Sequence, residues 1–363
     1  MSFRGAMSPR LFTAGALLGA SLQFIGCGSD SPADEKAQVA SAMQTSMKGD
    51  LSDLWQASVD LQAAAPLTVG RGWDATQDAA AIAAMKAAWV RARTAYEHVE
   101  GATAPIFSDI DISIDERYDG FLASPAGLAD ADLYDGAGIT GMHAIERVLY
   151  ADVIPANVIA FEATIPGYQP ATFPLTEAQA AEFKNGLCAK LVTDAKLLLD
   201  QWTPQQIDVA GAFKGLEGLM NEQQEKVNKA SSGEEESRYS QRTMADLRAN
   251  LDGTTKIYNL FSGWLQSKPA TAMVPATGVQ VDASIKGGFT SLAAVYATIP
   301  GDAIPTPPAT WAAEAPSAAD LLTPFGTLYE AVHGAVDPTM PGSVVYQMNE
   351  GALLLDIPVF SEE

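Results

Sequence analysis

Long segments with helical periodicity, separated by breaks that contain proline and glycine, constrain the fold of this chain more than any other feature of its sequence. The clearest segment runs from Thr76 to Glu100, and its apolar side chains recur at alternating three- and four-residue steps: Ile82, Met85, Trp89, Ala92, Tyr96 and Val99. Such spacing is typical of a helix that buries one face in a bundle. Alternating β-branched runs, which would indicate strands, are scarce. The pattern therefore predicts an all-α protein.

The same periodicity recurs along most of the 363 residues. Besides 76–100, helices are expected at 35–65, 139–150, 176–202, 205–229, 240–266, 281–299 and 317–333, with a further short helix within 343–363. The proline-containing segment 152–175 is expected to be a loop. Helices connected in this way predict a bilobal protein, with two four-helix bundles as lobes at roughly 35–175 and 176–363.

The first 27 residues have the features of a targeting segment. Arg4 and Arg10 provide positive charge, and an apolar run over residues 11–25 is too short to span a membrane comfortably. The run ends in Phe24-Ile25-Gly26-Cys27, which resembles the lipobox of bacterial lipoproteins. That resemblance implies export to the periplasm or cell envelope, with a lipid anchor on Cys27. An ordinary signal peptide with an incidental cysteine is the alternative, and it also predicts export.

The composition changes after the targeting segment. Residues 28–34 are small and polar and predict a flexible tether ahead of a helical domain at 35–363. The other cysteine, Cys188, lies in an apolar helical pattern and is expected to be buried and unpaired. The formal net charge of −22 disfavours binding of nucleic acid or of an anionic membrane surface by charge, and it favours attraction of cations.

A histidine and a glutamate three residues apart form the first candidate for a functional site. His143 and Glu146 lie in the predicted helix 139–150, where side chains at i and i+3 share one face. An imidazole nitrogen and a carboxylate oxygen are both suitable ligands for a first-row metal ion. The alternative is a solvent-exposed pair with no ligand.

A charged line accompanies the apolar face of the predicted helix 76–100. Arg93, Glu97 and Glu100 follow one another at i, i+4 and i+7. They form either a solvated surface with an ordinary ion pair or a pair of carboxylates directed at a metal. An acid-rich connection comes next, with Asp109, Asp111, Asp115, Glu116 and Asp119. This connection lacks the glycine and the closing glutamate of a calcium-binding loop.

Four motifs occur in the order typical of the imelysin-like family. They are Tyr96-Glu97-His98-Val99-Glu100, the acid-rich Ser108-Asp109-Ile110-Asp111 with Ile114-Asp115-Glu116-Arg117, Gly141-Met142-His143-Ala144-Ile145-Glu146, and Gly233-Glu234-Glu235-Glu236-Ser237-Arg238-Tyr239-Ser240 followed by Asp246-Leu247-Arg248-Ala249-Asn250. The last motif resembles the EfeO/EfeM branch. The resemblance implies an exported, often lipid-anchored, bilobal helical protein with a His-x-x-Glu metal site. Members of that branch act in periplasmic iron uptake beside a membrane permease.

The resemblance also implies a set of metal ligands. By position in the motifs they are Glu97, Glu100, Asp115, His143, Glu146 and Glu222. Asp111 is an alternative to Asp115, because one extra residue lies between Glu100 and Asp115. One imidazole with several carboxylates suits iron or manganese and tolerates zinc or copper. So many buried carboxylates would require a bound cation or raised pKa values.

Peptide cleavage is the enzymatic alternative, because the family carries a peptidase label. Zinc proteases that place their ligands on a helix generally use His-Glu-x-x-His. Of the three histidines, His98 points away from Glu97 on the predicted helix and His333 has no acidic cluster beside it. A non-catalytic interaction protein of the cell envelope is a third possibility. The sequence thus predicts a lipid-anchored protein without catalytic residues, which captures a transition metal, iron first, for an inner-membrane iron permease.

Overall fold

The computed structural model describes residues 32–124, 132–203 and 206–360. These residues form α-helices and connecting segments without a β-strand, so the predicted all-α fold is confirmed. The expected targeting segment, its Cys27 and residues 28–31 of the expected tether lie outside the described residues. Among the helices that are described, none is both long and apolar enough to cross a membrane.

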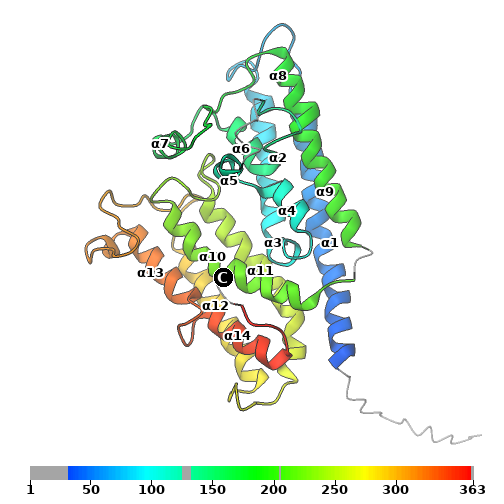
Figure 1. Ribbon diagram of the computed structural model, residues 1–363, viewed down its shortest axis with the longest axis vertical. Coiled ribbons are helices and arrows are strands. Elements are labelled where there is room, and N and C mark those ends of the chain that lie inside the picture. The colour runs from blue at the N-terminus through cyan, green and yellow to red at the C-terminus, as the bar shows by residue number, and fades with distance from the viewer. Residues whose placement is uncertain (1–31, 125–131, 204–205, 361–363) are drawn as a thin grey trace, which may run out of the picture.

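Eight helices of twelve or more residues make up about half of the described part of the chain (Figure 1). They are α1 (Pro32–Ala64), α2 (Ala79–Glu97), α9 (Cys188–Trp202), α10 (Val209–Lys229), α11 (Thr243–Gln266), α12 (Gly278–Ala297), α13 (Pro324–Val336) and α14 (Val344–Leu355). Each lies in or close to a segment for which the apolar periodicity predicts a helix. The periodic signal is strong there because a long helix shows one apolar face over several turns.

Short helices occupy the connections. They are α3 (Glu100–Thr103), α4 (Ser108–Asp115), α5 (Tyr118–Ala123), α6 (Gly141–Leu149), α7 (Ala156–Glu162) and α8 (Glu177–Glu182), with a π-helical turn at Phe183–Leu187 and a 3₁₀ turn at Asp320–Leu322. The expectation of a loop over 152–175 is therefore wrong in part, because α7 lies within it. A helix of two turns shows too little periodicity to be recognised from sequence.

The first group of helices consists of α1, α2 and α9, which lie side by side on the right of Figure 1. Apolar side chains of α1, among them Met47 and Leu54, are fully buried against this group, as are Trp89 of α2 and Leu191 of α9. The π-helical turn joins α8 to α9 without a break. Packing against α1 thus places α9 beside the N-terminal helices rather than beside the helices that follow it.

The second group consists of α10 to α14, at the lower left of Figure 1. Its core contains tilted and edge-to-face contacts among Phe213, Tyr258, Phe261 and Phe289. Helix α11 packs against α10 and α12 and also against α1 and α2, so it belongs to the interface between the two groups. Helix α4 contacts α6 and α9, and α6 contacts α2 and α9. Because α11 also contacts α2, the predicted site residues on α4 and α6 lie near this interface.

The helix expected over 76–100 ends earlier than predicted. Helix α2 stops at Glu97, and Val99, with φ −121° and ψ −15°, separates it from α3. At this point α11 comes very close, since a Cβ atom on Gly253 would lie 2.3 Å from the His98 carbonyl oxygen. The break places Glu97 and Glu100 on two different helices, so their separation is not that of a continuous helix.

Candidate metal centre

The position of His143 is set by the backbone at the start of α6. Gly141 has φ +86°, which only glycine adopts without strain, and a Cβ atom there would lie 2.2 Å from the carbonyl oxygen of Ile114. The beginning of α6 is therefore pressed against the last turn of α4. The indole nitrogen of Trp89 in α2 donates a hydrogen bond of 2.9 Å to the Met142 carbonyl. These contacts hold the next residue, His143, beside the end of α4.

Asp115 is the last residue of α4. The side chain of Ile114 anchors this turn in the core, and Glu116 then continues in extended conformation. Asp115 receives a hydrogen bond from Nη1 of Arg93, which projects from α2. The end of the short helix thus directs the Asp115 carboxylate toward the interior of the protein.

Glu236 comes from the loop between α10 and α11. The loop turns at Gly233, where φ is +85° and a Cβ atom would lie 2.8 Å from the Asn157 carbonyl oxygen. Further along, the amide of Ser237 donates to Thr243 Oγ1 over 3.1 Å, and Arg238 donates to Asp119 over 2.6 Å. These bonds fix the loop between α5, α7 and α11. Glu236 is consequently held with its carboxylate directed at His143.

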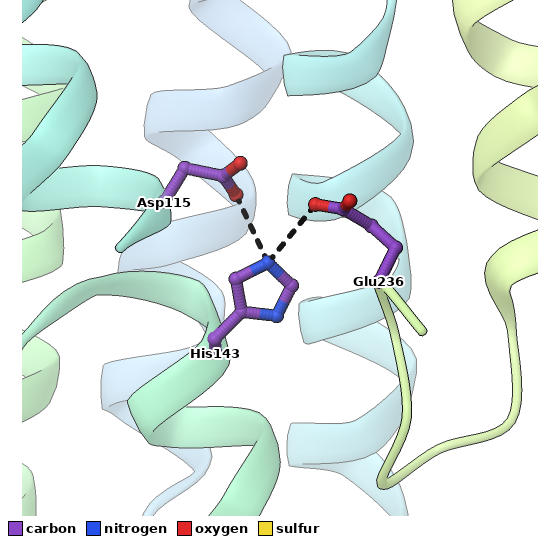
Figure 2. A group of neighbouring side chains, drawn as sticks. All are labelled: Asp115, His143 and Glu236. Carbon is purple, nitrogen blue, oxygen red and sulfur yellow. Dashed lines mark ion pairs between the residues drawn. The ribbon is translucent and has the colours of Figure 1, made fainter. Parts of the chain in front are cut away.

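The three side chains converge on one point, as Figure 2 shows. Nε2 of His143 lies 3.4 Å from an oxygen of Asp115 and 3.4 Å from an oxygen of Glu236. One ligand atom from each of the three residues lies within 4.8 Å of the others. Nε2 is buried and makes no hydrogen bond of good geometry. We call Asp115, His143 and Glu236 the candidate triad.

The other ring nitrogen of His143 faces Glu146. Nδ1 lies 3.2 Å from Glu146 Oε2, and the second oxygen of Glu146 accepts a hydrogen bond of 2.8 Å from the Ser240 amide. The i,i+3 pair is in contact and fully buried, which excludes a solvent-exposed pair. In this arrangement Glu146 fixes the orientation of the imidazole, as carboxylates commonly do behind a metal-binding histidine.

The remaining predicted ligands lie around the triad. Glu97 is fully buried and bonded to Arg93 and to the amide of Asn250. Glu100 accepts a 3.0 Å hydrogen bond from the same amide. Together with Asp115, Glu236 and Lys226, Glu100 and Glu222 line a partly open cavity of about 270 Å³. The alternative ligand Asp111 is bonded to the Tyr96 hydroxyl, so in this structure Asp115 rather than Asp111 contacts His143.

Comparison with known proteins places this architecture in a family. The imelysin family model, of peptidase family M75, matches residues 50–322. The chain belongs to the imelysin family. Its fold is similar to the crystal structure of an imelysin-like protein from Psychrobacter arcticum 273-4, with a TM-score of 0.58 and 14% sequence identity, over 92% of this chain and 98% of that chain. A comparison with curated protein sequences finds no significant match.

Two buried cations balance part of the negative charge at the imelysin centre. Arg93 is 1% exposed and contacts Asp115 and Glu97, and its Nη2 lies 2.9 Å from Glu236. The ammonium of Lys226 lies 3.5 Å from Glu236. The sequence left open whether Arg93 and Glu97 form a solvated surface, and burial excludes that possibility. From the sequence, a bound cation or raised carboxylate pKa values were expected to offset the buried negative charge. Arg93 and Lys226 offset part of that charge from within the protein.

The pKa values of the triad follow from these contacts. Burial alone would lower the pKa of His143, but the Asp115 carboxylate and the close contacts with Glu146 and Glu236 raise it to about 9. Burial raises the pKa of Asp115 against the opposing charges of Arg93 and His143. Burial would also raise the pKa of Glu236, yet Lys226, His143 and Arg93 together hold it well below its usual range. Without a metal, His143 is therefore an imidazolium between two carboxylates.

Carboxyl groups around the triad retain protons more readily than usual. Burial, reinforced by neighbouring carboxylates, raises the pKa of Asp111 to about 7, and burial raises that of Glu222 to about 7 and that of Asp246 to about 6. Burial also raises the pKa of Glu97 well above its usual range, although Arg93 opposes it. The carboxyl groups around the triad thus outnumber the buried positive charges, and several have raised pKa values, as the sequence predicted for a cluster of this composition.

The residues present fit a metal ion. The triad offers one imidazole nitrogen and two carboxylates, and Nε2, the nitrogen that would bind, has no other hydrogen-bond partner. A nitrogen–oxygen donor set of this kind suits divalent iron, manganese or zinc. A metal would take the place of the imidazolium proton, since only the neutral ring binds a metal. The buried group of Asp115, His143 and Glu236 can therefore hold a metal ion whose identity the geometry leaves open.

Sequence reasoning missed two participants. Glu236 lies in the Gly-Glu-Glu-Glu-Ser-Arg motif that supported the family resemblance, but the run of three glutamates gives no indication which one faces inward. Lys226 belongs to none of the four motifs, although it follows Glu222 by one helical turn. The structure decides between the glutamates, since Glu235 bonds to Gln241 whereas Glu236 faces His143.

Proposed function

We propose that this protein is an exported, lipid-anchored metal carrier of the EfeO/EfeM kind, which captures a transition-metal ion, iron first, and delivers it to a membrane permease. The observation that supports metal capture most directly is the buried, unbonded Nε2 of His143 between two carboxylates. The acidic character of the whole chain, with a net charge of −22, favours the approach of cations.

In this proposal the predicted ligands take different positions. Asp115 and His143 bind directly, with Glu236 added to the set. Glu100 and Glu222 line the cavity beside the triad and offer further oxygens as the ion enters. Glu146 holds the imidazole through Nδ1. Glu97 is bonded to Arg93 and Asn250, so it supports the centre through Arg93. It becomes a ligand only if the metal ion displaces these two contacts.

The choice of iron rests on chemistry and on resemblance. Carboxylates are hard ligands, and a site with more oxygen than nitrogen donors suits iron and manganese more than copper. Zinc remains acceptable to the same donors. The EfeO/EfeM resemblance, which carries the link to iron uptake and to a permease partner, rests on the sequence motifs around 233–250.

Metal binding is tested on the full-length chain, purified in detergent and freed of metal by chelation. Fe²⁺, Fe³⁺, Mn²⁺, Zn²⁺ and Cu²⁺ are each added, and bound metal per chain is measured by mass spectrometry with affinities from calorimetry. We expect stoichiometric binding, tightest for iron, that is lost in His143→Ala. The matched control is His98→Ala, because His98 is half-buried and pairs with Asp50 instead of the triad. Failure of the folded wild type to bind any of these ions would contradict the proposal.

The peptidase label of the family gives the enzymatic alternative a test of its own. The metal-loaded protein is incubated with a peptide library, and cleavage is compared between wild type and His143→Ala. Our proposal expects no cleavage by either. Metal-dependent cleavage that the substitution abolishes would establish the enzyme instead.

The anchor is tested in cells. A bacterial host is labelled with radioactive palmitate, and we expect label in the wild type and none in Cys27→Ser. Unlabelled wild type that is nevertheless processed and exported would favour an ordinary signal peptide.

A further inference from the structure

The two buried cations of the centre are held in different ways. The guanidinium of Arg93 bonds directly to Asp115, Glu97 and Glu236 and is fixed from several sides. Its planar fork suits such multiple contacts. Arg93 is therefore a permanent part of the protein framework beneath the triad.

Lys226 is held loosely. Its ammonium lies 3.4 Å from Asn250 Oδ1, 3.5 Å from Glu236 Oε2 and 3.9 Å from Glu100 Oε2. All three distances exceed the usual length of a charge-assisted hydrogen bond, about 2.7–2.9 Å. Lys226 is 6% exposed, yet it forms part of the cavity wall. Lys226 thus attracts the carboxylates as a charge without being locked to any of them.

The ammonium lies where a metal ion would find its oxygens. Glu236 belongs to the triad, and Glu100 and Glu222 lie on the same cavity. A metal ion binds carboxylate oxygens at about 2.0–2.2 Å, much closer than the ammonium. The ammonium of Lys226 and a bound metal ion would repel each other and compete for the same oxygens. Because lysine has a flexible four-carbon stem and the cavity is partly open, the ammonium is able to withdraw.

We propose that Lys226 is a tethered competitor of the metal ion: its ammonium neutralises the carboxylates of the metal-free centre and withdraws into the cavity when an ion binds. This inference rests on the proposed metal binding and adds a residue that sets its strength. Lys226 keeps the empty centre stable at the expense of affinity. Such a counterion lets a carrier release its ion, because the ammonium is always present to replace it.

The test compares two lysines of one cavity in the full-length protein. Lys226→Met removes the central ammonium and keeps an unbranched side chain of similar length. Lys229→Met removes the same charge one turn away, where Lys229 pairs with exposed Glu225. Affinity for Mn²⁺ is measured by competition with a fluorescent chelator. We expect Lys226→Met to bind Mn²⁺ at least about tenfold more tightly than wild type, and Lys229→Met to differ by less than about threefold.

A second measurement uses the wild type alone and does not depend on a variant that folds. Lysines are acetylated briefly with and without Mn²⁺, and modification is quantified by peptide mass spectrometry. We expect Mn²⁺ to increase acetylation of Lys226, because its ammonium moves toward the cavity mouth, and to leave Lys229 unchanged.

The outcomes separate this inference from the proposed function. If wild type binds Mn²⁺ but Lys226→Met binds no more tightly, or if acetylation of Lys226 is unchanged or falls on binding, Lys226 is not a competitor and metal capture stands. If wild type fails to bind and Lys226→Met binds, the inference holds in its strongest form. If neither protein binds Mn²⁺ or iron, the proposed function fails, and the inference fails with it.

Discussion

Two buried carboxylate sites differ in how their charge is balanced: Asp282 within the second group of helices, and the candidate triad at the interface between the two groups. Asp282 of α12 receives hydrogen bonds from Tyr258 at 3.0 Å, from Gln266 at 2.7 Å and from Lys286 at 2.9 Å. Both oxygens of this single acid are therefore satisfied. At the candidate triad, Asp115 and Glu236 share Arg93 with two further acids, and Nε2 of His143 makes no hydrogen bond of good geometry.

The pKa values express this difference. Burial would raise the pKa of Asp282, but the donors around it, Lys286 first, lower it below its usual value. Burial raises the pKa of Asp115 despite Arg93. A buried carboxylate that is surrounded by hydrogen-bond donors stabilises the fold. A group of buried acids that outnumbers its donors leaves negative charge that an added cation would balance. The comparison identifies the candidate triad, and not Asp282, as the place for a ligand.

Removal of the cation from each cluster tests this comparison most strongly. Arg93→Met leaves its buried carboxylates without their common partner and is expected to lower the free energy of unfolding by about 3–5 kcal/mol. Lys286→Met is expected to cost about 1 kcal/mol or less, because the Lys286 side chain is 39% exposed. Urea unfolding of the metal-free proteins measures both. Equal losses would mean that the two clusters do not differ as described.

An acid without a well-placed donor extends the comparison. Both oxygens of Glu217 in α10 are buried without a hydrogen bond of good geometry, and burial raises its pKa to about 9 although Lys214 and the Phe360 backbone oppose the shift. The folded protein thus keeps Glu217 protonated while the unfolded chain ionises above pH 4.5, so stability falls as the pH rises from 4.5 to 9. At pH 7 this costs about 3 kcal/mol, which Glu217→Gln is expected to recover.

Urea unfolding at pH 5, 7 and 8 measures this effect. The gap between Glu217→Gln and wild type should widen with pH up to about 9. Glu225→Gln, on the exposed side of the same helix, serves as control and should change stability by about 0.5 kcal/mol or less. A gap that is independent of pH would show that Glu217 is ionised when folded.

Removal of one acid from each cluster should separate stability from binding. Asp115→Asn is expected to weaken metal binding about a hundredfold, near 2.7 kcal/mol, and Asp282→Asn to leave it unchanged. Stability of the metal-free protein should respond in the opposite way. Asp282→Asn lowers it by about 1–2 kcal/mol through lost hydrogen bonds, whereas Asp115→Asn leaves it unchanged or raises it by up to about 1 kcal/mol.

Mn²⁺ calorimetry and urea unfolding of both variants supply the four values. Loss of metal binding in Asp282→Asn, or a large loss of stability in Asp115→Asn, would contradict the division into a structural and a functional cluster.

The long helices and the family could be predicted from the amino-acid sequence alone. Apolar periodicity located all the long helices of the described residues, because a helix with a buried face shows that face in its own residues. It also placed His143 and Glu146 on one side of a helix, where the structure finds them in contact. The four motifs indicated the imelysin family to which the chain belongs. Each of these features is local in the chain, or is a short pattern that can be recognised residue by residue.

Which side chains meet, and how their charge is balanced, became evident from the three-dimensional arrangement of the helices. Glu236 reaches His143 from 93 residues away because the Gly233 turn packs on α7, and Asp115 does so because Gly141 admits the backbone of α4. Arg93 and Lys226 are cations of the centre only because helices from both groups bury them. Convergence and burial depend on contacts between distant segments, and periodicity within one segment carries no information about them.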